Sequence, residues 1–406
     1  MSARRLRPDE RRTLVLLGLP TAALALAITF VTTYVPVVAD RFLDSTTVIG
    51  LLIGLEGVIA LWLPIVVGRW SDELGRRLPF LAWATPVAAL SLVAIGLSGS
   101  FAPLALAVVL FFLAYFVAYE PYRALYPDLM ADEIAARAQG TQAVWRGLGT
   151  GLALVGGGML VAIGTDVAFF AAAAIFAAAM VAFLGPALRM ARGRRTETAG
   201  ADPATLRALL RARPVLRSYF AANACWEASL GALKTFVFLY VIQGLDRSKP
   251  AAAGIIGGVA LLVVLAAPLT GKLADRYGRS RVLAATLPFY GVGLLVPAFT
   301  QSIAILVPVM VVVGFGGAMV MSLPYALLQP LMPHGQHGLL TGFYSVSRGI
   351  GTAIGPAAAG IAIETLHGPF GSTDGYAAMW LVCGGTILLS LPFLLALRRR
   401  EGPGGP

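Results

Sequence analysis

Charge is scarce in this chain. Only 13% of its 406 residues are charged, while 58% are hydrophobic, and a soluble globular protein carries about twice that share of charge. The imbalance excludes an ordinary soluble fold. It predicts that the lipid bilayer is the solvent for most of the sequence.

Residues for covalent or cofactor chemistry are missing as well. The two cysteines, Cys225 and Cys383, lie inside apolar runs, and two isolated thiols form neither a disulfide framework nor a metal site. The sequence has no Gly-rich loop ending in Gly-Lys-Ser/Thr that would bind a nucleotide, and no evident pairing of a nucleophile with a base. We therefore expect no enzyme, no cofactor and no metal. A non-transporting membrane receptor or a membrane enzyme is the alternative of another class.

Twelve apolar runs are long enough to cross a bilayer as helices, which takes about 20 residues. The first follows a basic tail, but it is much longer than the apolar core of a signal peptide, about 7–15 residues, so we interpret it as a spanning helix. The sequence thus predicts an all-α, multi-pass membrane protein. The runs lie near 13–38, 48–67, 79–98, 102–120, 139–163, 167–188, 215–243, 252–270, 282–300, 303–328, 339–363 and 376–397.

Lysine and arginine gather in alternate loops. If the N-terminus is cytoplasmic, most of the 31 basic residues fall in inner segments, as the positive-inside rule requires. Topology then explains the net charge of +11 without nucleic-acid binding. We expect both termini in the cytoplasm and the chain in the plasma or inner membrane.

The chain repeats itself at half its length. The decapeptide GRWSDELGRR at 68–77 returns as GKLADRYGRS at 271–280, and RGLGT at 146–150 returns as RGIGT at 348–352. Each half therefore holds six predicted helices, with the charged decapeptide between its second and third and the arginine motif in its fifth.

These motifs resemble the major facilitator superfamily, in which Gly-x-x-x-Asp-x-x-Gly-Arg marks the cytoplasmic loop after the second helix of each half. The resemblance covers essentially the whole chain. It implies two pseudo-symmetric six-helix bundles that move a small-molecule substrate by alternating access. The expected domains are residues 1–188 and 215–406, joined by a cytoplasmic linker at 189–214 with the composition of a solvated segment.

The resemblance also implies a cytoplasmic gate. Asp72 and Asp275 are expected to face helix N-termini of the opposite half, near Gly338–Thr341 and Gln139–Thr141, while the glycines allow tight turns and the arginines hold the aspartates or lipid phosphates. A plain polar turn is the alternative. The predicted gate residues are Gly68, Asp72, Gly75, Arg76, Gly271, Asp275, Gly278 and Arg279.

Ionisable side chains inside apolar runs are costly, so each is a candidate for function. Glu56 and Arg348 both lie roughly 14 Å deep in a hydrocarbon core of about 30 Å, and the resemblance implies that their helices face each other. An ion pair between them is expected. A coupling role and a static role in holding the halves together are both open.

The run at 215–243 carries Asn223, Trp226, Glu227 and Lys234. Asn223 and Glu227 share a helix face, and Lys234 follows two turns later on nearly the same side. An aromatic ring flanked by an amide and a carboxylate suits a hydroxylated ligand. We predict substrate binding or coupling here, with an internal Glu227–Lys234 structural pair as the alternative.

Arg146 and Arg348 occupy matching positions in the two halves, which favours a shared structural purpose as readily as substrate binding. Both remain among the substrate-binding or coupling candidates. The full set is Glu56, Asn223, Trp226, Glu227, Lys234, Arg348 and Arg146.

Three cytoplasmic motifs, SDELGRRLPF, YRALYPDL and GTQAVWRGLG, resemble the sucrose and glycoside cation-symporter branch of the superfamily. This resemblance implies import of a sugar or glycoside with a proton. We expect a proton or a sodium ion as the coupling ion and a monomer as the functional unit. The alternative is a proton-coupled exporter of drugs or small metabolites. The arginine in the fourth helix and the Gly-Pro pattern in the fifth that are typical of such exporters are missing.

Overall fold

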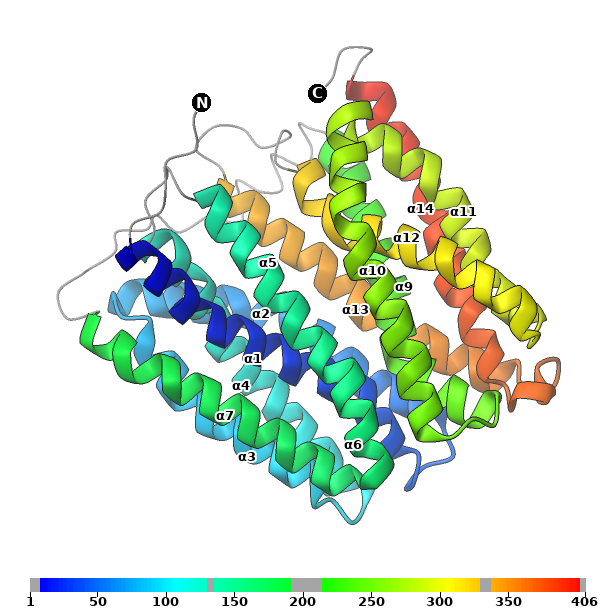
Figure 1. Cartoon of the computed structure of the whole chain (residues 1–406), viewed down its shortest axis with the longest axis horizontal. Coiled ribbons are helices and arrows are strands. Elements are labelled where there is room, and N and C mark those ends of the chain that lie inside the picture. Colours follow the sequence, from blue (N-terminus) through cyan, green and yellow to red (C-terminus); the bar gives the residue numbers. More distant parts are fainter. Residues whose placement is uncertain (1–7, 130–134, 191–213, 329–336, 402–406) are drawn as a thin grey trace. The chain divides into compact units, whose positions relative to one another are not determined.

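The computed structural model describes residues 8–129, 135–190, 214–328 and 337–401 (Figure 1). These residues form helices joined by short turns, and no strand occurs among them. The helices of the first half are α1 (Pro8–Ala39), α2 (Thr46–Leu74), α3 (Leu78–Gly96), α4 (Phe101–Leu129), α5 (Ala135–Gly151), α6 (Gly157–Ile163) and α7 (Thr165–Met190). Those of the second half are α9 (Pro214–Leu239), α10 (Lys249–Tyr277), α11 (Arg279–Phe299), α12 (Ile303–Leu328), α13 (His337–Thr365) and α14 (Met379–Glu401).

Within the described ranges, twelve helical segments are long and apolar enough to cross a membrane. This count confirms the prediction of a 12-span, all-α membrane fold. A π-helical turn, Leu152–Gly156, joins α5 to α6, so that the two helices form one span. A second π-helical turn, Tyr240–Gly244, extends α9, and two short 3₁₀ turns, Gly371–Thr373 and Tyr376–Ala378, precede α14.

The charged decapeptides are more helical than the sequence suggested. Gly68 lies inside α2 and Gly271 inside α10, so neither makes the tight turn expected of it. The turn falls on the second glycine of each copy, where φ is 58° at Gly75 and 88° at Gly278. Only the second glycine is needed for its backbone, because a positive φ is costly for residues with a Cβ atom.

The described chain divides into two compact units, but not at the middle of the sequence. One unit contains residues 1–32 and 62–199, and the other contains 33–61 and 200–406. Helices α1 and α2 therefore contribute to both units. The predicted linker at 189–214 lies mostly outside the described residues, and the division into domains at 1–188 and 215–406 stays a prediction.

In the first unit, close backbone contact brings α5 against α1. A Cβ atom on Gly149 would overlap the carbonyl oxygen of Ala22, so only glycine permits this approach. The hydroxyl of Tyr122 on α4 contacts the carbonyl oxygen of Leu17 and the hydroxyl of Thr21 on α1. Helix α3 packs against both α4 and α7.

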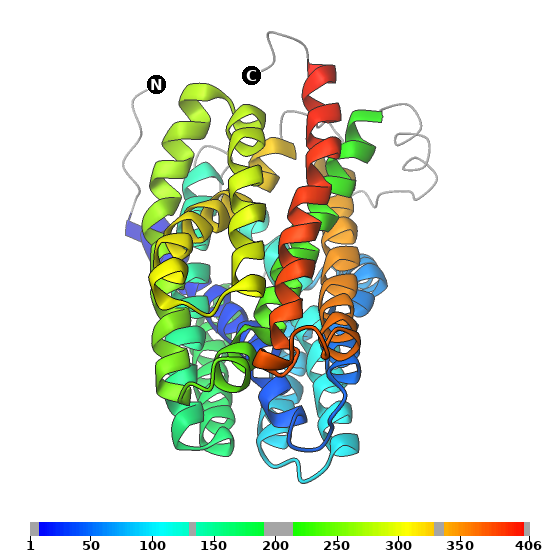
Figure 2. The same ribbon diagram turned by 90° about the vertical axis from the view of Figure 1, so that its right-hand side faces the viewer.

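In the second unit, α9 packs against both α13 and α14, and α13 also contacts α14 (Figures 1 and 2). The crossing of α9 and α13 repeats the glycine contact of the first unit, because a Cβ atom on Gly351 would overlap the carbonyl oxygen of Ala224. Gly149 and Gly351 occupy the same place in the repeated arginine motif. The sequence repeat is therefore also a repeat of helix packing.

Large apolar side chains remain exposed along several spans. On α10, four such side chains are more than half exposed: Leu261, Val264, Leu265 and Leu269. Such a surface is unfavourable in water and suits contact with lipid tails.

Candidate functional site

A cluster of charged side chains lies within the membrane spans of the second unit. Helix α9 supplies Glu227 and α13 supplies Arg348, whose Nε atom is 3.6 Å from a carboxylate oxygen of Glu227. The Glu227 side chain is 16% exposed and that of Arg348 is 35% exposed. The pair is therefore shielded from bulk solvent, but its guanidinium is still accessible.

The close approach of α9 and α13 builds this pair. Gly351 and Gly355 allow the backbone of α13 to touch that of α9 at Ala224 and Ala228. Glu227 lies between these two contact points, and Arg348 lies one turn before Gly351. Small residues at a helix crossing thus place a carboxylate and a guanidinium at ion-pair distance.

A buried amide supports the same crossing. Asn223 has no exposed surface, and its Nδ2 atom donates to the hydroxyl of Ser347 at 2.8 Å. The Ser347 hydroxyl in turn donates to the carbonyl of Tyr344. The Oδ1 atom of Asn223 is buried without a hydrogen-bond partner in the described part of the chain. Asn223 therefore fixes the position of Ser347, the residue next to Arg348, and keeps an unused acceptor.

Glu56 joins the cluster from α2. It is only 6% exposed and lies within electrostatic range of Arg348, Lys234 and Glu227. Its helix is held against α13 by small residues, since a Cβ atom on Gly54 would come within 2.7 Å of the carbonyl oxygen of Ala353. Four of the predicted residues, Glu56, Glu227, Lys234 and Arg348, are thus brought together.

The partners inside this cluster differ from the prediction. Helical depth suggested Glu56 as the acid that pairs with Arg348, whereas the structure places Glu227 at ion-pair distance. The alternative of an internal Glu227–Lys234 pair is likewise not what the structure shows, because the Glu227 carboxylate faces Arg348 on α13. Depth in the membrane cannot distinguish between two acids at a similar level. The crossing of α9 and α13 determines which of them reaches Arg348.

Trp226 lies away from the charged cluster. Its indole is 1% exposed and its Nε1 atom donates to the hydroxyl of Ser390 on α14 at 2.8 Å. Consecutive residues of a helix point in different directions, so Trp226 faces α14 while Glu227 faces α13. The prediction that Trp226 binds substrate is not supported by this geometry, because the ring fills the core of the second unit.

Arg146 belongs to the other unit and to a different environment. It is exposed, and its Nη2 atom lies 3.4 Å from the hydroxyl of Tyr119 on α4. The Tyr119 ring stacks on Tyr115, with centroids 5.3 Å apart, and the guanidinium of Arg123 lies 5.5 Å from its centre. The two matching arginines therefore do not share one structural role.

The two gate motifs also differ. Asp72 forms an ion pair with Arg77 at 3.0 Å, and Arg77 is buried whereas Arg76 is exposed. The arginine that holds Asp72 is thus Arg77 rather than the predicted Arg76. Sequence reasoning overlooked Arg77 because the repeat replaces it by Ser280.

In the second copy, Asp275 is exposed and the guanidinium of Arg279 donates to the carbonyl of Ala326 on α12 at 2.5 Å. Arg279 therefore ties its turn to α12 through a backbone oxygen. The predicted contacts of the two aspartates with the helix starts near Gly338–Thr341 and Gln139–Thr141 involve side chains that lie mainly outside the described set, and they stay predictions.

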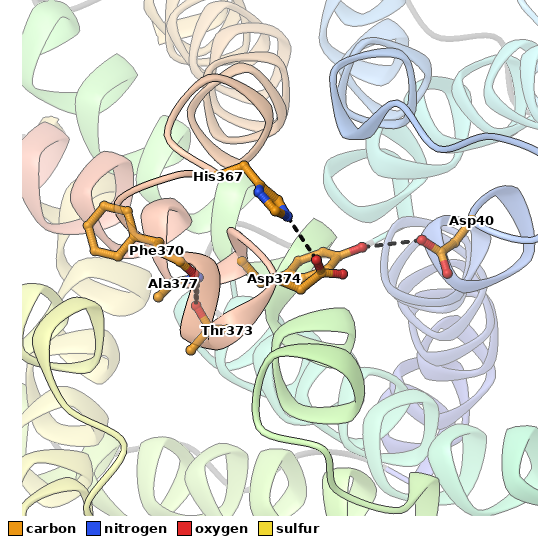
Figure 3. Close-up of polar contacts among 7 residues, drawn as sticks. Asp40, His367, Phe370, Thr373, Asp374 and Ala377 are labelled. Carbon is orange, nitrogen blue, oxygen red and sulfur yellow. Dashed lines mark hydrogen bonds and ion pairs between the residues drawn. The ribbon is translucent and has the colours of Figure 1, made fainter.

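Sequence reasoning missed a polar contact at the ends of the spans that lie away from the gate motifs. Asp40, which follows α1, accepts hydrogen bonds from the amide of Gln243 and from the hydroxyl of Tyr376, the latter at 3.2 Å. Figure 3 shows Asp40 facing the turn that carries Thr373 and Asp374. Asp40 and Gln243 are themselves 203 residues apart, the spacing of the repeat, which is the signal that could have found them.

Burial raises the pKa of the Asp40 carboxyl above its ordinary value, and the hydrogen bonds from Gln243 and Tyr376 oppose this shift. The nearby carboxylates of Asp374 and Asp44 raise it further. Within the turn, Asp374 is itself held by His367 at 2.9 Å (Figure 3).

The start of α2 is bound to the end of α13 beside this contact. A carboxylate oxygen of Glu364 accepts from the Ser45 hydroxyl at 2.8 Å and from the Thr47 amide at 3.1 Å, and the Thr46 hydroxyl donates to the carbonyl of Gly360. An acidic group at a helix N-terminus is favourable for the helix dipole. We call Asp40, Ser45, Gln243, Glu364 and Tyr376 the outer clasp.

The sequence profile of the Major Facilitator Superfamily matches residues 15–265 and 248–406. The chain belongs to this superfamily. The two matches overlap at residues 248–265 and together cover most of the chain. The predicted family is therefore confirmed, while the sucrose and glycoside branch is not specified by the match.

Solved superfamily structures share the fold at low sequence identity. A bacterial homologue of the human lysosomal transporter Spinster, in an inward-facing and occupied conformation, aligns with a TM-score of 0.78 and 16% identity over 97% of this chain and 98% of its own. The nucleoside transporter NupG aligns with a TM-score of 0.73 and 16% identity over 95% and 99% of the two chains. Both alignments show the shared fold, and membership of the superfamily agrees with the expectation that the chain is not an enzyme.

Curated relatives match only in part. A triacylglyceride transporter of Mycolicibacterium hassiacum is 25% identical over 163 residues, which are 38% of this chain and 30% of that protein. Multidrug resistance protein 3 of Bacillus subtilis is 25% identical over 104 residues, 26% of this chain and 20% of that protein. These matches span less than a third of the relatives' own length.

Proposed function

We propose that this superfamily member is a secondary active transporter that moves a small organic solute by alternating access, driven by an ion gradient. The observation that carries the proposal is the cluster of Glu56, Glu227, Lys234 and Arg348 within the spans of the second unit. Two acids and two bases inside the membrane are expensive to maintain. In such a cluster, one acid can be neutralised by a proton or a bound cation while the remaining charged side chains still have partners of opposite charge.

Within this proposal, Glu56 is the group that takes up and releases the coupling proton, and the Glu227–Arg348 pair responds to its charge. Lys234 offers a polar group beside the pair for a hydroxylated solute, while the fully buried Asn223 supports the helix crossing that holds the pair. The outer clasp and the two gate motifs are the contacts that open and close on the two faces, with both termini in the cytoplasm and the monomer in the plasma or inner membrane.

The substrate proposed first is a sugar or glycoside imported with a proton, or with sodium as the alternative ion. The cytoplasmic motifs that resemble the sucrose and glycoside branch support it. Export of drugs or other apolar molecules is the second candidate. It is favoured by the relatives that are named as a multidrug resistance protein and a triacylglyceride transporter.

The experiment is transport in reconstituted vesicles, with and without an inward proton gradient. We expect accumulation of solute against its own gradient. Glu56→Gln should abolish this accumulation but retain exchange between two filled compartments, because exchange does not require a net proton movement. Asp166→Asn, which removes an exposed carboxylate at the other end of a span, is the matched control and should accumulate normally.

Unaltered accumulation by Glu56→Gln would contradict the role of Glu56. Accumulation that a proton gradient drives outward instead of inward would replace import by export. Absence of transport in either direction, with correctly folded protein, would favour the receptor class.

A further inference from the structure

Arg146 is a membrane arginine for which the described residues supply no carboxylate partner. It lies five residues into the span Thr141–Ile163, about 8 Å from the inner end at 1.5 Å per residue. Among the residues that the structure describes, no Asp or Glu lies at ion-pair distance from it, and its hydrogen-bond partner is the hydroxyl of Tyr119. A charge at this depth is costly unless it faces a partner or a water-filled space.

The internal repeat shows that the first half has no acid at the position equivalent to Glu227. Gly149 meets the carbonyl of Ala22 just as Gly351 meets that of Ala224, so the two helix crossings are equivalent. Three residues after Ala224 comes Glu227, the partner of Arg348. Three residues after Ala22 comes Ala25. The first half has kept the arginine and has a methyl group where the carboxylate would be.

Aromatic rings border the exposed guanidinium. Tyr115 and Tyr119 stack at 5.3 Å with an angle of 15° between their planes, and Tyr119 carries the guanidinium of Arg123 over its ring. Arg123 is 3.7 Å from Glu120, so its charge is already partly balanced. Arg146 is therefore the cation of this group that retains its full charge for another anion.

We infer that Arg146 and the Tyr119 hydroxyl bind a carboxylate or phosphate group on the transported solute. The inference rests on the proposed function, because it names the chemical class of the transported molecule as an organic anion. The guanidinium presents several donors in one plane, which matches a carboxylate or phosphate better than an ammonium does.

The test uses three matched pairs of probes that differ only in an anionic group. They are 4-nitrophenyl glucoside and glucuronide, glucose and glucose 6-phosphate, and benzamide and benzoate. Binding is measured by thermal stabilisation of purified protein, and uptake is measured in vesicles. We expect at least one anionic probe to bind about tenfold or more tightly than its neutral partner, as charge-assisted hydrogen bonds allow.

Arg146→Gln should remove this preference, while Arg146→Lys should keep part of it because the charge remains. The control is Arg217→Gln, which removes an exposed arginine from the start of α9 and should leave the preference unchanged. Tyr119→Phe should weaken it by a smaller factor. If no probe pair shows a preference that depends on Arg146, the inference is overturned.

Lipid phosphate is the other source of the same chemistry, so every measurement is made in phosphatidylcholine alone and with added phosphatidylglycerol. A preference present in phosphatidylcholine alone supports the solute site. If Arg146 matters only when phosphatidylglycerol is present, the arginine holds a lipid headgroup and the inference is overturned. Uphill uptake of neutral probes without any anion preference would leave the proposed function standing. Arg146-dependent binding of anionic probes without transport would support the anion site and contradict the proposed transport function.

Discussion

The two halves of the chain use one arginine in opposite ways. Arg348 is paired with Glu227 inside the second unit, and Arg146 is exposed beside Tyr119 in the first. The glycine crossings that position them are equivalent, so the backbone does not cause the difference. A single position on the facing helix, Glu227 or Ala25, decides it. The helix crossing is the same in both repeats, but only one of the two arginines has an acidic partner. The same backbone arrangement can therefore serve two different functions.

The largest expected difference between the two halves is the loss of stability when Arg348 or Arg146 is replaced by alanine. Arg348→Ala leaves two acids without their guanidinium, a loss that approaches the ~3–5 kcal/mol of a broken buried pair but stays below it, because a third of the Arg348 side chain is exposed. Arg146→Ala should change stability by no more than ~0.5 kcal/mol, as for other exposed positions. Thermal unfolding of both variants in detergent makes the comparison.

A double variant sharpens this result. Glu227→Gln together with Arg348→Gln replaces both charges by amides of similar size, so it should be more stable than Arg348→Gln alone. Strictly additive losses would show that the 3.6 Å contact contributes no coupling energy, and equal losses at Arg146 and Arg348 would remove the contrast between the halves.

The glycine crossings should behave alike in the two halves. Gly149→Ala and Gly351→Ala each place a methyl group against a carbonyl of the facing helix, and overpacking of this kind costs ~1–3 kcal/mol. Gly147→Ala and Gly254→Ala are the controls, because nothing lies within 4 Å of a Cβ atom there. They should be neutral or slightly stabilising. A loss confined to one half would contradict the equivalence of the crossings.

The two gate turns should differ in strain. Gly278 has φ 88° and ψ 135°, a combination close to the glycine-only region, and an alanine there is expected to cost ~1–3 kcal/mol. Gly75, with φ 58°, lies in the left-handed helical range, where the cost is nearer ~1 kcal/mol. Unfolding of Gly75→Ala and Gly278→Ala measures the order, and a larger loss at Gly75 would reverse this expectation.

The smallest effect concerns the matching residues Asp40 and Gln243 in the outer clasp. The folded pKa of Asp40 is raised by burial, so the folded state binds its proton more tightly than the unfolded chain does. Stability should therefore fall as the pH rises from the unfolded pKa, about 3.9, through the raised folded value, and stay lower above it. Asp40→Asn should flatten this part of the profile by at most about 1 kcal/mol. Asp166→Asn, at an exposed carboxylate that does not contribute to this shift, should not.

Sequence reasoning was accurate where a short-range pattern is sufficient. The number of spans, the repeat at half length and the superfamily all follow from apolar run length and from motifs such as GRWSDELGRR. It was less accurate inside the decapeptides. Gly68 and Gly271 were expected in turns but are helical, because α2 and α10 continue to the second glycine, where the backbone reaches a positive φ.

The set of charged residues inside the spans was also available from the sequence, since Asp, Glu, Lys and Arg are conspicuous in an apolar run. Their partners were not. Arg77 rather than Arg76 holds Asp72, Glu227 rather than Glu56 is the acid at ion-pair distance from Arg348, and Trp226 faces Ser390. The first contact depends on the turn at Gly75, and the other two depend on the rotation of one helix against another.

Hydropathy and repetition along the chain determined that this protein crosses the membrane twelve times and is built twice from one plan, because lipid leaves the backbone no alternative to closed helices. Tertiary structure alone decided which arginine is neutralised. Ion pairing requires two side chains within a few ångströms, and that distance is set where the glycines of α13 and α5 meet the carbonyls of α9 and α1. The matching motifs around Arg146 and Arg348 therefore give no sign of their difference until the facing helix is in place.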